Sequence, residues 1–131
     1  MSKSKILVVD DDPNFSRLVA MILKLGAGYE VLEENHSSVA HETALRFRPD
    51  LILLDLDMPG KDGGAVWLEI SQDPKLAGTS VIFLSGLVSK EEEGIRAGLS
   101  YLSKPVDSRL LLHAVRAACP RFRPERNLAI A

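Results

Sequence analysis

The segment from Leu51 to Asp55 restricts the fold of this chain more than any other. Four consecutive leucine and isoleucine residues precede the aspartate, and Pro59-Gly60 follows shortly after it. A short apolar run without alternation is typical of a strand buried on both faces, and proline with glycine marks a turn. We therefore expect a buried strand that carries Asp55 at its carboxyl end, a position suited to chemistry.

The rest of the chain alternates between short apolar runs and segments with apolar residues at helical spacing. Asp12 is expected to cap the helix that begins at Pro13. Ser89-Lys90-Glu91-Glu92 is a capping box that predicts a short fourth helix, closed by Gly98. The expected strands are 6–9, 29–33, 51–55, 81–84 and 99–103; the expected helices run from 13 to about 26, 39–48, after Gly63-Gly64, 89 to about 97, and 107 to about 119.

Five strands that alternate with five helices predict an α/β fold with a doubly wound parallel sheet. Right-handed crossovers favour the flavodoxin-like strand order 2-1-3-4-5. At 131 residues the chain suits one domain, expected over 1–119, with a flexible C-terminal tail over 120–131. Ligands of such sheets bind beyond the carboxyl ends of the strands, where the first and third strands would bring Asp10, Asp11 and Asp55 together.

Composition narrows the class of protein. A formal net charge of -2 gives no bias toward nucleic acid or an anionic membrane, so no direct nucleic-acid binding is expected. No apolar run approaches the ~18 residues of a membrane span, and the start lacks a signal peptide, so we expect no membrane insertion. Cys119 is the single cysteine, which suits a reducing compartment. A cytoplasmic protein is expected.

The three clustered carboxylates need a cation, because like charges about 5 Å apart repel by roughly 3 kcal/mol per pair at an effective dielectric of ~20. Oxygen ligands favour Mg²⁺, to which the backbone carbonyl of Asp57 could add a ligand. Lys104 and Ser85 follow other strands to the same edge and can contact a phosphate. A carboxylate, a divalent metal, a lysine and a hydroxyl suit phosphoryl transfer to Asp55.

Four motifs in this order resemble the receiver domain of two-component response regulators, and the chain is similar to the single-domain chemotaxis type. The resemblance extends from about Ile6 to Cys119. The motifs are Val8-Val9-Asp10-Asp11-Asp12-Pro13, the segment from Pro49 to Gly60, Leu84-Ser85-Gly86 and Tyr101-Leu102-Ser103-Lys104-Pro105.

The resemblance implies a role for each matching residue. Asp55 would be the phosphoacceptor, Asp11 a direct Mg²⁺ ligand and Asp10 a ligand mainly through water. Lys104 would contact the phosphoryl group, with a cis bond to Pro105, while Ser85 and Tyr101 would be the switch residues. The implied partners are a sensor histidine kinase or histidine phosphotransfer protein and a downstream protein target, reached through a surface that also forms homodimers in the family. Such a switch phosphorylates and dephosphorylates itself without turning over a free substrate.

Two other functions remain open at this point. Asp55-Leu56-Asp57 is similar to the Asp-x-Asp motif of haloacid-dehalogenase-like phosphohydrolases, although that motif sits on a first strand and precedes Gly-Thr. A phosphorylation-independent adaptor would keep the fold and bind its partners constitutively. The complete acidic set argues against the adaptor.

The chain departs from the receiver pattern at two places. Ser85 and Lys104 are 19 positions apart (104 minus 85), fewer than is usual, so the fourth helix and the output surface that it helps to form are shortened. Asp57 adds an acid two residues after Asp55, a position that tunes the lifetime of the acyl phosphate in receivers. We therefore expect Asp57 to affect hydrolysis more than folding.

Overall fold

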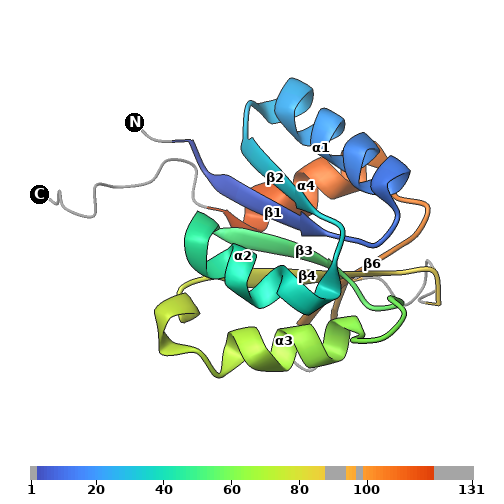
Figure 1. Ribbon diagram of the computed structural model, residues 1–131. Coiled ribbons are helices and arrows are strands. Elements are labelled where there is room, and N and C mark those ends of the chain that lie inside the picture. Colours follow the sequence, from blue (N-terminus) through green and yellow to red (C-terminus); the bar gives the residue numbers. More distant parts are fainter. Residues whose placement is uncertain (1–2, 88–93, 97–98, 120–131) are drawn as a thin grey trace, which may run out of the picture.

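The alternating segments form a central sheet with helices on both faces (Figure 1). A computed structural model describes residues 3–87, 94–96 and 99–119. Its strands are β1 (Lys5–Val9), β2 (Glu30–Glu34), β3 (Leu51–Asp55), β4 (Ser80–Ser85), β5 (Gly94–Arg96) and β6 (Leu99–Ser103). Its helices are α1 (Pro13–Ala27), α2 (Ala40–Phe47), α3 (Gly63–Ser71) and α4 (Ser108–Ala118), with short 3-10 helices η1 (Ser37–Val39) and η2 (Pro74–Leu76).

The strand order is β2-β1-β3-β4-β6-β5. The first five of these strands are parallel, so the predicted flavodoxin-like order is confirmed, with β6 as its fifth strand. β1 and β3 are neighbours in register, with Val9 opposite Leu54. The residues that follow these two strands therefore leave the same edge of the sheet side by side.

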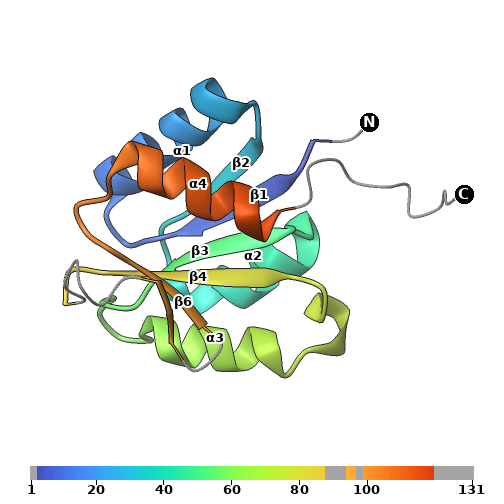
Figure 2. The ribbon, with the colours of Figure 1, turned by 180° about the vertical axis from the view of Figure 1, so that it is seen from behind.

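The strands β1, β3, β4 and β6 contribute alternate side chains to two separate cores. Ile6 and Val8 of β1 face α1 and α4, whereas Leu7 and Val9 face α2 and α3. Figure 2 shows α4 beside α1 on the first of these faces. Because both faces are covered, β3 is buried along its whole length, as its continuous apolar sequence predicts.

Aspartate caps fix where α1, α3 and α4 begin. The side chain of Asp12 accepts a hydrogen bond from the backbone N–H of Asn14, which confirms the predicted cap of α1. Asp62 and Asp107 cap α3 and α4 in the same way. Gly28 ends α1 with a φ of 70°, a left-handed conformation that glycine adopts without strain.

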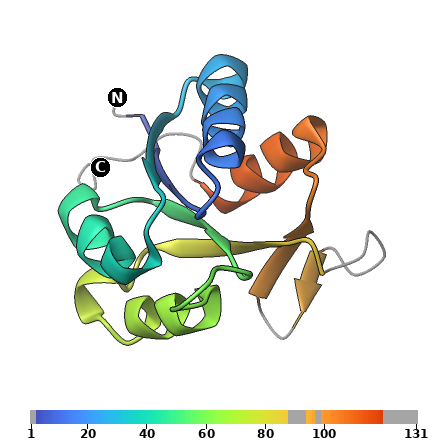
Figure 3. The same ribbon diagram turned by 45° about the vertical axis from the view of Figure 1, so that its right-hand side comes forward.

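The predicted fourth helix, 89 to about 97, is wrong at residues 94–96, and the described residues contain four α-helices. Gly94–Arg96 forms β5, which pairs antiparallel with β6 so that Arg96 lies opposite Leu99. Figure 3 shows the two strands side by side at the edge of the sheet. Residues 88–93, which include the whole of the predicted capping box, lie outside the described residues, as does the tail over 120–131.

A strand competes well with a helix here for two reasons. Nine residues are fewer than an isolated helix needs for stability, and Gly94 weakens a helix further. In addition, two residues of the sequence, 97 and 98, separate β5 from β6, and two is the loop length of the commonest hairpins. The sequence pattern at the start of this segment is compatible with a helix, whereas pairing with the open edge of β6 is a tertiary effect.

Candidate functional site

Asp55 is held at the buried end of β3. Its side chain accepts a hydrogen bond from the backbone N–H of Asp57 at 3.0 Å, and the residue is 1% exposed. The first turn of α3 packs directly on this point, because a Cβ at Gly63 would lie 2.3 Å from the carbonyl oxygen of Asp55. Only glycine at position 63 lets the chain turn this closely behind Asp55.

Asp10 and Asp11 follow β1 and differ in exposure. Asp10 is completely buried, and its Oδ1 accepts a hydrogen bond from the backbone N–H of Asp12 at 2.9 Å. Asp11 is exposed. One carboxylate oxygen from each of Asp10, Asp11 and Asp55 lies within 4.8 Å of the others, so the predicted meeting of the three acids is found.

Lys104 reaches this cluster from the end of β6. Its Nζ lies 2.8 Å from Oδ2 of Asp10 and 3.3 Å from Oδ1 of Asp55. The ammonium also lies 4.5 Å from the centre of the Phe15 ring, within the range of a cation–π contact. The peptide bond between Lys104 and Pro105 is cis, as the resemblance implies.

The charges at the site match a divalent cation. Three carboxylates and one ammonium leave two negative charges (three minus one) in a small volume. Oδ2 of Asp10 is buried and receives no hydrogen bond of good geometry from the described residues, although the Lys104 ammonium lies 2.8 Å from it. An oxygen ligand set of this kind, open to water through Asp11, fits a hard ion that keeps part of its hydration shell.

The pKa values of Asp55 and Lys104 are both raised. A raised pKa disfavours the charged form of the acid and favours the charged form of the amine. Burial raises the pKa of Asp55 above its usual value and outweighs the Asp57 N–H and the Lys104 ammonium, which lower it. Burial alone would lower the pKa of Lys104, but the carboxylates of Asp10 and Asp55 together outweigh it and raise that pKa. Lys104 is therefore held charged, while the charge on Asp55 is costly.

Ser85 ends β4 at the same edge but bonds to Asp57. Its hydroxyl donates to Oδ2 of Asp57 at 2.9 Å, and the backbone N–H of Gly86 donates to the same oxygen at 3.2 Å. Asp57 was expected to matter through its backbone carbonyl and through the hydrolysis rate. Those two expectations stay predictions, and the structure adds that the carboxylate of Asp57 bridges the end of β3 and the loop after β4.

Tyr101 lies apart from the acids, on the face covered by α2 and α3. Its ring packs against Phe83, with the two centroids 5.3 Å apart, and Phe83 in turn lies 6.3 Å from the centre of Trp67. The residue is half-buried. A movement of Tyr101 would therefore disturb this aromatic row rather than the cluster itself.

Sequence reasoning missed two contributors. The first is Phe15, which packs against the core and whose ring also contacts the Lys104 ammonium. Asn35 follows β2 and donates from Nδ2 to the backbone carbonyl of Asp10 at 2.7 Å and to the buried Ser16 hydroxyl at 2.9 Å. Its place directly after a strand was a usable signal, because every strand of a parallel sheet ends at this edge.

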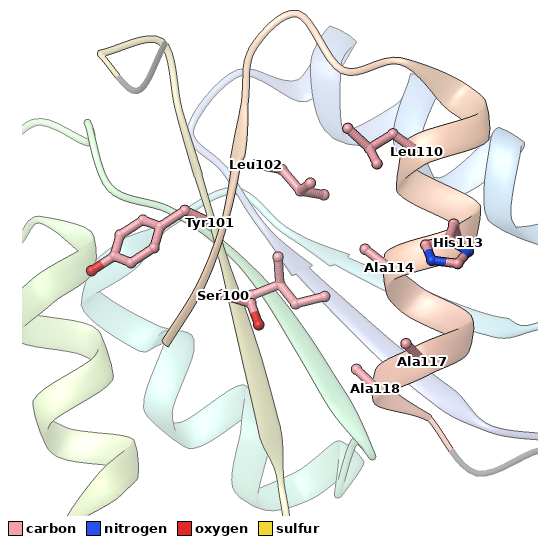
Figure 4. A pocket seen from close by; sticks show the side chains of 9 residues that line it. Ser100, Tyr101, Leu102, Leu110, His113, Ala114, Ala117 and Ala118 are labelled. Atoms are coloured by element: carbon pink, nitrogen blue, oxygen red, sulfur yellow. The ribbon is translucent and has the colours of Figure 1, made fainter. Parts of the chain in front are cut away.

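A cavity of about 410 Å³ lies between β6 and α4, away from the acids. Figure 4 shows Leu102, Leu110 and Ala114 around it, with the Tyr101 ring on the opposite side of β6. None of its lining residues belongs to the acidic cluster. The chemistry of the site thus resides in an open edge of the sheet and not in this apolar cavity.

The fold and the site define a flavodoxin-like α/β domain with a carboxylate–lysine cluster at the carboxyl edge of its sheet. The family model described as the response regulator receiver domain matches residues 6–116. The chain belongs to this family, which acts in two-component signal transduction. In the haloacid-dehalogenase-like pattern the first strand carries the nucleophile, whereas Asp55 ends the third, so that alternative is not supported.

Similar proteins include both single-domain and longer regulators. Protein PilH of Pseudomonas aeruginosa is 32% identical over 121 residues, covering 87% of this chain and 96% of PilH. The DNA-binding dual master transcriptional regulator RpaA of Synechocystis is 36% identical over 120 residues, covering 89% of this chain and 49% of RpaA. The chain thus spans about half the length of RpaA, and 53% of the similar phosphate regulon regulator PhoB of Pseudomonas aeruginosa.

Solved structures give the same fold. The chemotaxis protein CheY4 of Vibrio cholerae superposes with a TM-score of 0.77 at 26% identity, covering 89% of this chain and 99% of CheY4. None of the helices in the described part of the chain has the length and apolar character that a membrane crossing requires.

Proposed function

We propose that Asp55 accepts a phosphoryl group from a histidine kinase or histidine phosphotransfer protein and that this modification switches a protein-interaction surface. The observation that carries the proposal is the contact of one lysine, Lys104, with both buried acids. A surface cluster of acids would not bury a carboxylate against an ammonium. A site that receives a phosphoryl group, with up to two negative charges, at Asp55 needs both the acid and a fixed positive charge.

The transfer exchanges one bond to phosphorus for another. An Oδ oxygen of Asp55 attacks the phosphorus, the P–N bond to the donor imidazole breaks, and its electron pair remains on the ring nitrogen, which takes a proton from water. Hydrolysis later adds water to phosphorus and returns the carboxylate with inorganic phosphate. Lys104 stabilises the added negative charge in both steps, and the buried walls of β1 and β3 keep the acid in place.

Asp10, Asp11 and Asp55, with the backbone carbonyl of Asp57, are the residues that would hold Mg²⁺. The two uncompensated negative charges, and the buried Oδ2 of Asp10 that is paired with the Lys104 ammonium, support this assignment. When bound, the ion supplies neutralisation of the phosphoryl oxygens. The chain itself orients Asp55 through the Asp57 N–H and supplies the Lys104 ammonium.

The output of the switch would pass through the loop after β4. A phosphoryl group on Asp55 adds strong acceptors that draw Ser85 and Lys104 inward, and Tyr101 would follow on the neighbouring strand. The partners are then the phosphodonor protein and a downstream protein target, with a homodimer as a further arrangement of the output surface. No turnover of a free substrate is expected.

Intact mass spectrometry tests the proposal directly. Incubation with Mg²⁺ and a small acyl-phosphate donor should add one phosphoryl group to the wild-type protein and none to Asp55→Asn. The matched control is Asp12→Asn, which removes a neighbouring exposed charge but keeps a residue able to cap α1. Modification of Asp12→Asn should equal that of the wild type.

Two outcomes would contradict the proposal. Absence of modification with any donor would favour a phosphorylation-independent adaptor. Sustained multiple turnover of phosphomonoesters would favour a phosphohydrolase. A pull-down that compares the phosphorylated protein with Asp55→Asn would then identify the target of the switched form.

A further inference from the structure

The carboxylate of Asp57 holds the loop after β4 through two hydrogen bonds to a single oxygen. Oδ2 accepts from the Ser85 hydroxyl at 2.9 Å and from the Gly86 N–H at 3.2 Å. The Ser85 oxygen in turn accepts from the Leu87 N–H at 3.0 Å. Three successive residues of this loop are thus tied, directly or through Ser85, to one side chain at the end of β3.

These bonds compete with the contact that phosphorylation requires. A hydroxyl has one proton, so Ser85 cannot donate to a phosphoryl oxygen on Asp55 while it donates to Asp57. Asp57 lies two residues after Asp55, and its backbone N–H donates to Oδ1 of Asp55 at 3.0 Å. Before modification, Asp57 is the bonded acceptor of the Ser85 proton.

We propose that Asp57 is a latch that keeps Ser85 and Gly86 in the unphosphorylated arrangement until a phosphoryl group on Asp55 displaces it. This inference rests on the proposed phosphorylation of Asp55. The phosphoryl group carries about -1.5 to -2 charges and three acceptor oxygens, so it outcompetes one carboxylate for the proton and repels Asp57. Asp57 acts on the reaction through Ser85 and is a positioning residue.

Release of the latch also changes the surface. Leu87 is 84% exposed. Its backbone N–H is bonded to the Ser85 oxygen that the latch holds. A turn of Ser85 toward Asp55 would remove this support and move Leu87, which connects the site to a residue that a partner can contact.

A double-mutant cycle in the full chain tests the latch. The probe is beryllofluoride, a phosphoryl analogue, titrated with Mg²⁺ while the Gly86 amide is followed by NMR. Asp57→Ala should tighten its binding by about tenfold, because the analogue no longer competes with a charged acceptor for Ser85. In a Ser85→Ala background, the gain from Asp57→Ala should decrease to about threefold or less.

The controls separate the latch from a general effect of charge. Asp62→Asn removes a nearby exposed charge while keeping a residue that can cap α3, and it should leave the affinity unchanged. Asp57→Asn, which keeps an acceptor oxygen without the charge, should give an intermediate gain. Without any analogue, Asp57→Ala should also speed exchange of the Gly86 amide proton, whereas Asp62→Asn should not.

The outcomes distinguish the inference from the function on which it rests. An equal gain from Asp57→Ala in both backgrounds, or unchanged Gly86 exchange, would overturn the latch and leave the phosphoacceptor role intact. No binding of beryllofluoride to the wild-type protein would overturn the proposed function, and the latch with it.

Discussion

Replacing Lys104 by methionine tests whether the ammonium compensates the two buried acids. Methionine keeps an apolar stem against Phe15 but leaves Asp10 and Asp55 without a positive charge. At the N–O distances of 2.8 and 3.3 Å, the attractions are about 6 and 5 kcal/mol at an effective dielectric of ~20. Desolvation of the three groups offsets most of this sum.

The net cost follows from how deeply the pair is buried. Removing one partner of a fully buried pair costs about 3 to 5 kcal/mol, because the remaining charge has no compensation. The Lys104 side chain is 23% exposed, and the acids can take up a proton, so we expect a loss of about 2 to 4 kcal/mol at pH 7 without divalent ions. That is a large part of the stability of a domain of this size.

Urea unfolding in the presence of EDTA measures the effect. The matched control is Lys61→Met, which breaks a partly exposed pair with Glu69 at 2.9 Å and should cost less than about 1 kcal/mol. Adding Asp10→Asn to Lys104→Met should recover part of the loss, since it removes one uncompensated charge. If Lys104→Met were no more destabilising than Lys61→Met, the ammonium would not be compensating the acids.

Further predictions concern packing, protonation and reactivity. Gly63→Ala should lower the free energy of unfolding by about 1 to 3 kcal/mol, because its Cβ would meet the Asp55 carbonyl oxygen at 2.3 Å. Gly64→Ala is the control and should be neutral or stabilising, since its Cβ would meet only Asp62 Oδ1, at 3.4 Å. Equal effects of the two substitutions on urea unfolding would contradict this prediction. The raised pKa of Asp55 means that the folded protein binds this proton more tightly than the unfolded chain, so stability from this group is present below about pH 4 and is lost as the pH rises through the folded pKa. Asp55→Asn should then be more stable than the wild type at pH 7 without Mg²⁺, and a gain that persisted at pH 3 would refute this cause. Burial raises the pKa of Cys119 to about 12, so thiol reagents at pH 8 should modify it only at the rate of local unfolding. The rate of modification should therefore fall when sulfate is added, because sulfate stabilises the folded state.

Most of the parallel sheet could be predicted because its strands are short, apolar and end in acids or a serine. The acids Asp10, Asp11 and Asp55 could be placed together because the strand order brings the ends of β1 and β3 to one edge. The cap at Asp12 was equally local, since it depends on a side chain and the backbone two residues away. Such features need only sequence spacing and general rules of chain geometry.

The failure at the fourth helix has a different cause. A capping box describes how a helix can begin, but it does not show whether the helix has a surface to pack on or a strand edge that competes for the same residues. Gly94–Arg96 pairs with β6, a partner that is formed only when the sheet is assembled. Local propensity is weak in a segment this short, so tertiary pairing decides.

The sequence by itself determined the parallel sheet, the edge at which its acids meet and the family that uses such an edge, because apolar periodicity and strand ends are properties of neighbouring residues. Only the tertiary structure decided which atoms share protons and charge there. Lys104 divides its ammonium between Asp10 and Asp55, and Ser85 donates to Asp57 instead of turning to Asp55. These contacts join residues from different strands, and hydrogen bonds depend on distances of a few tenths of an ångström that spacing along the chain does not set.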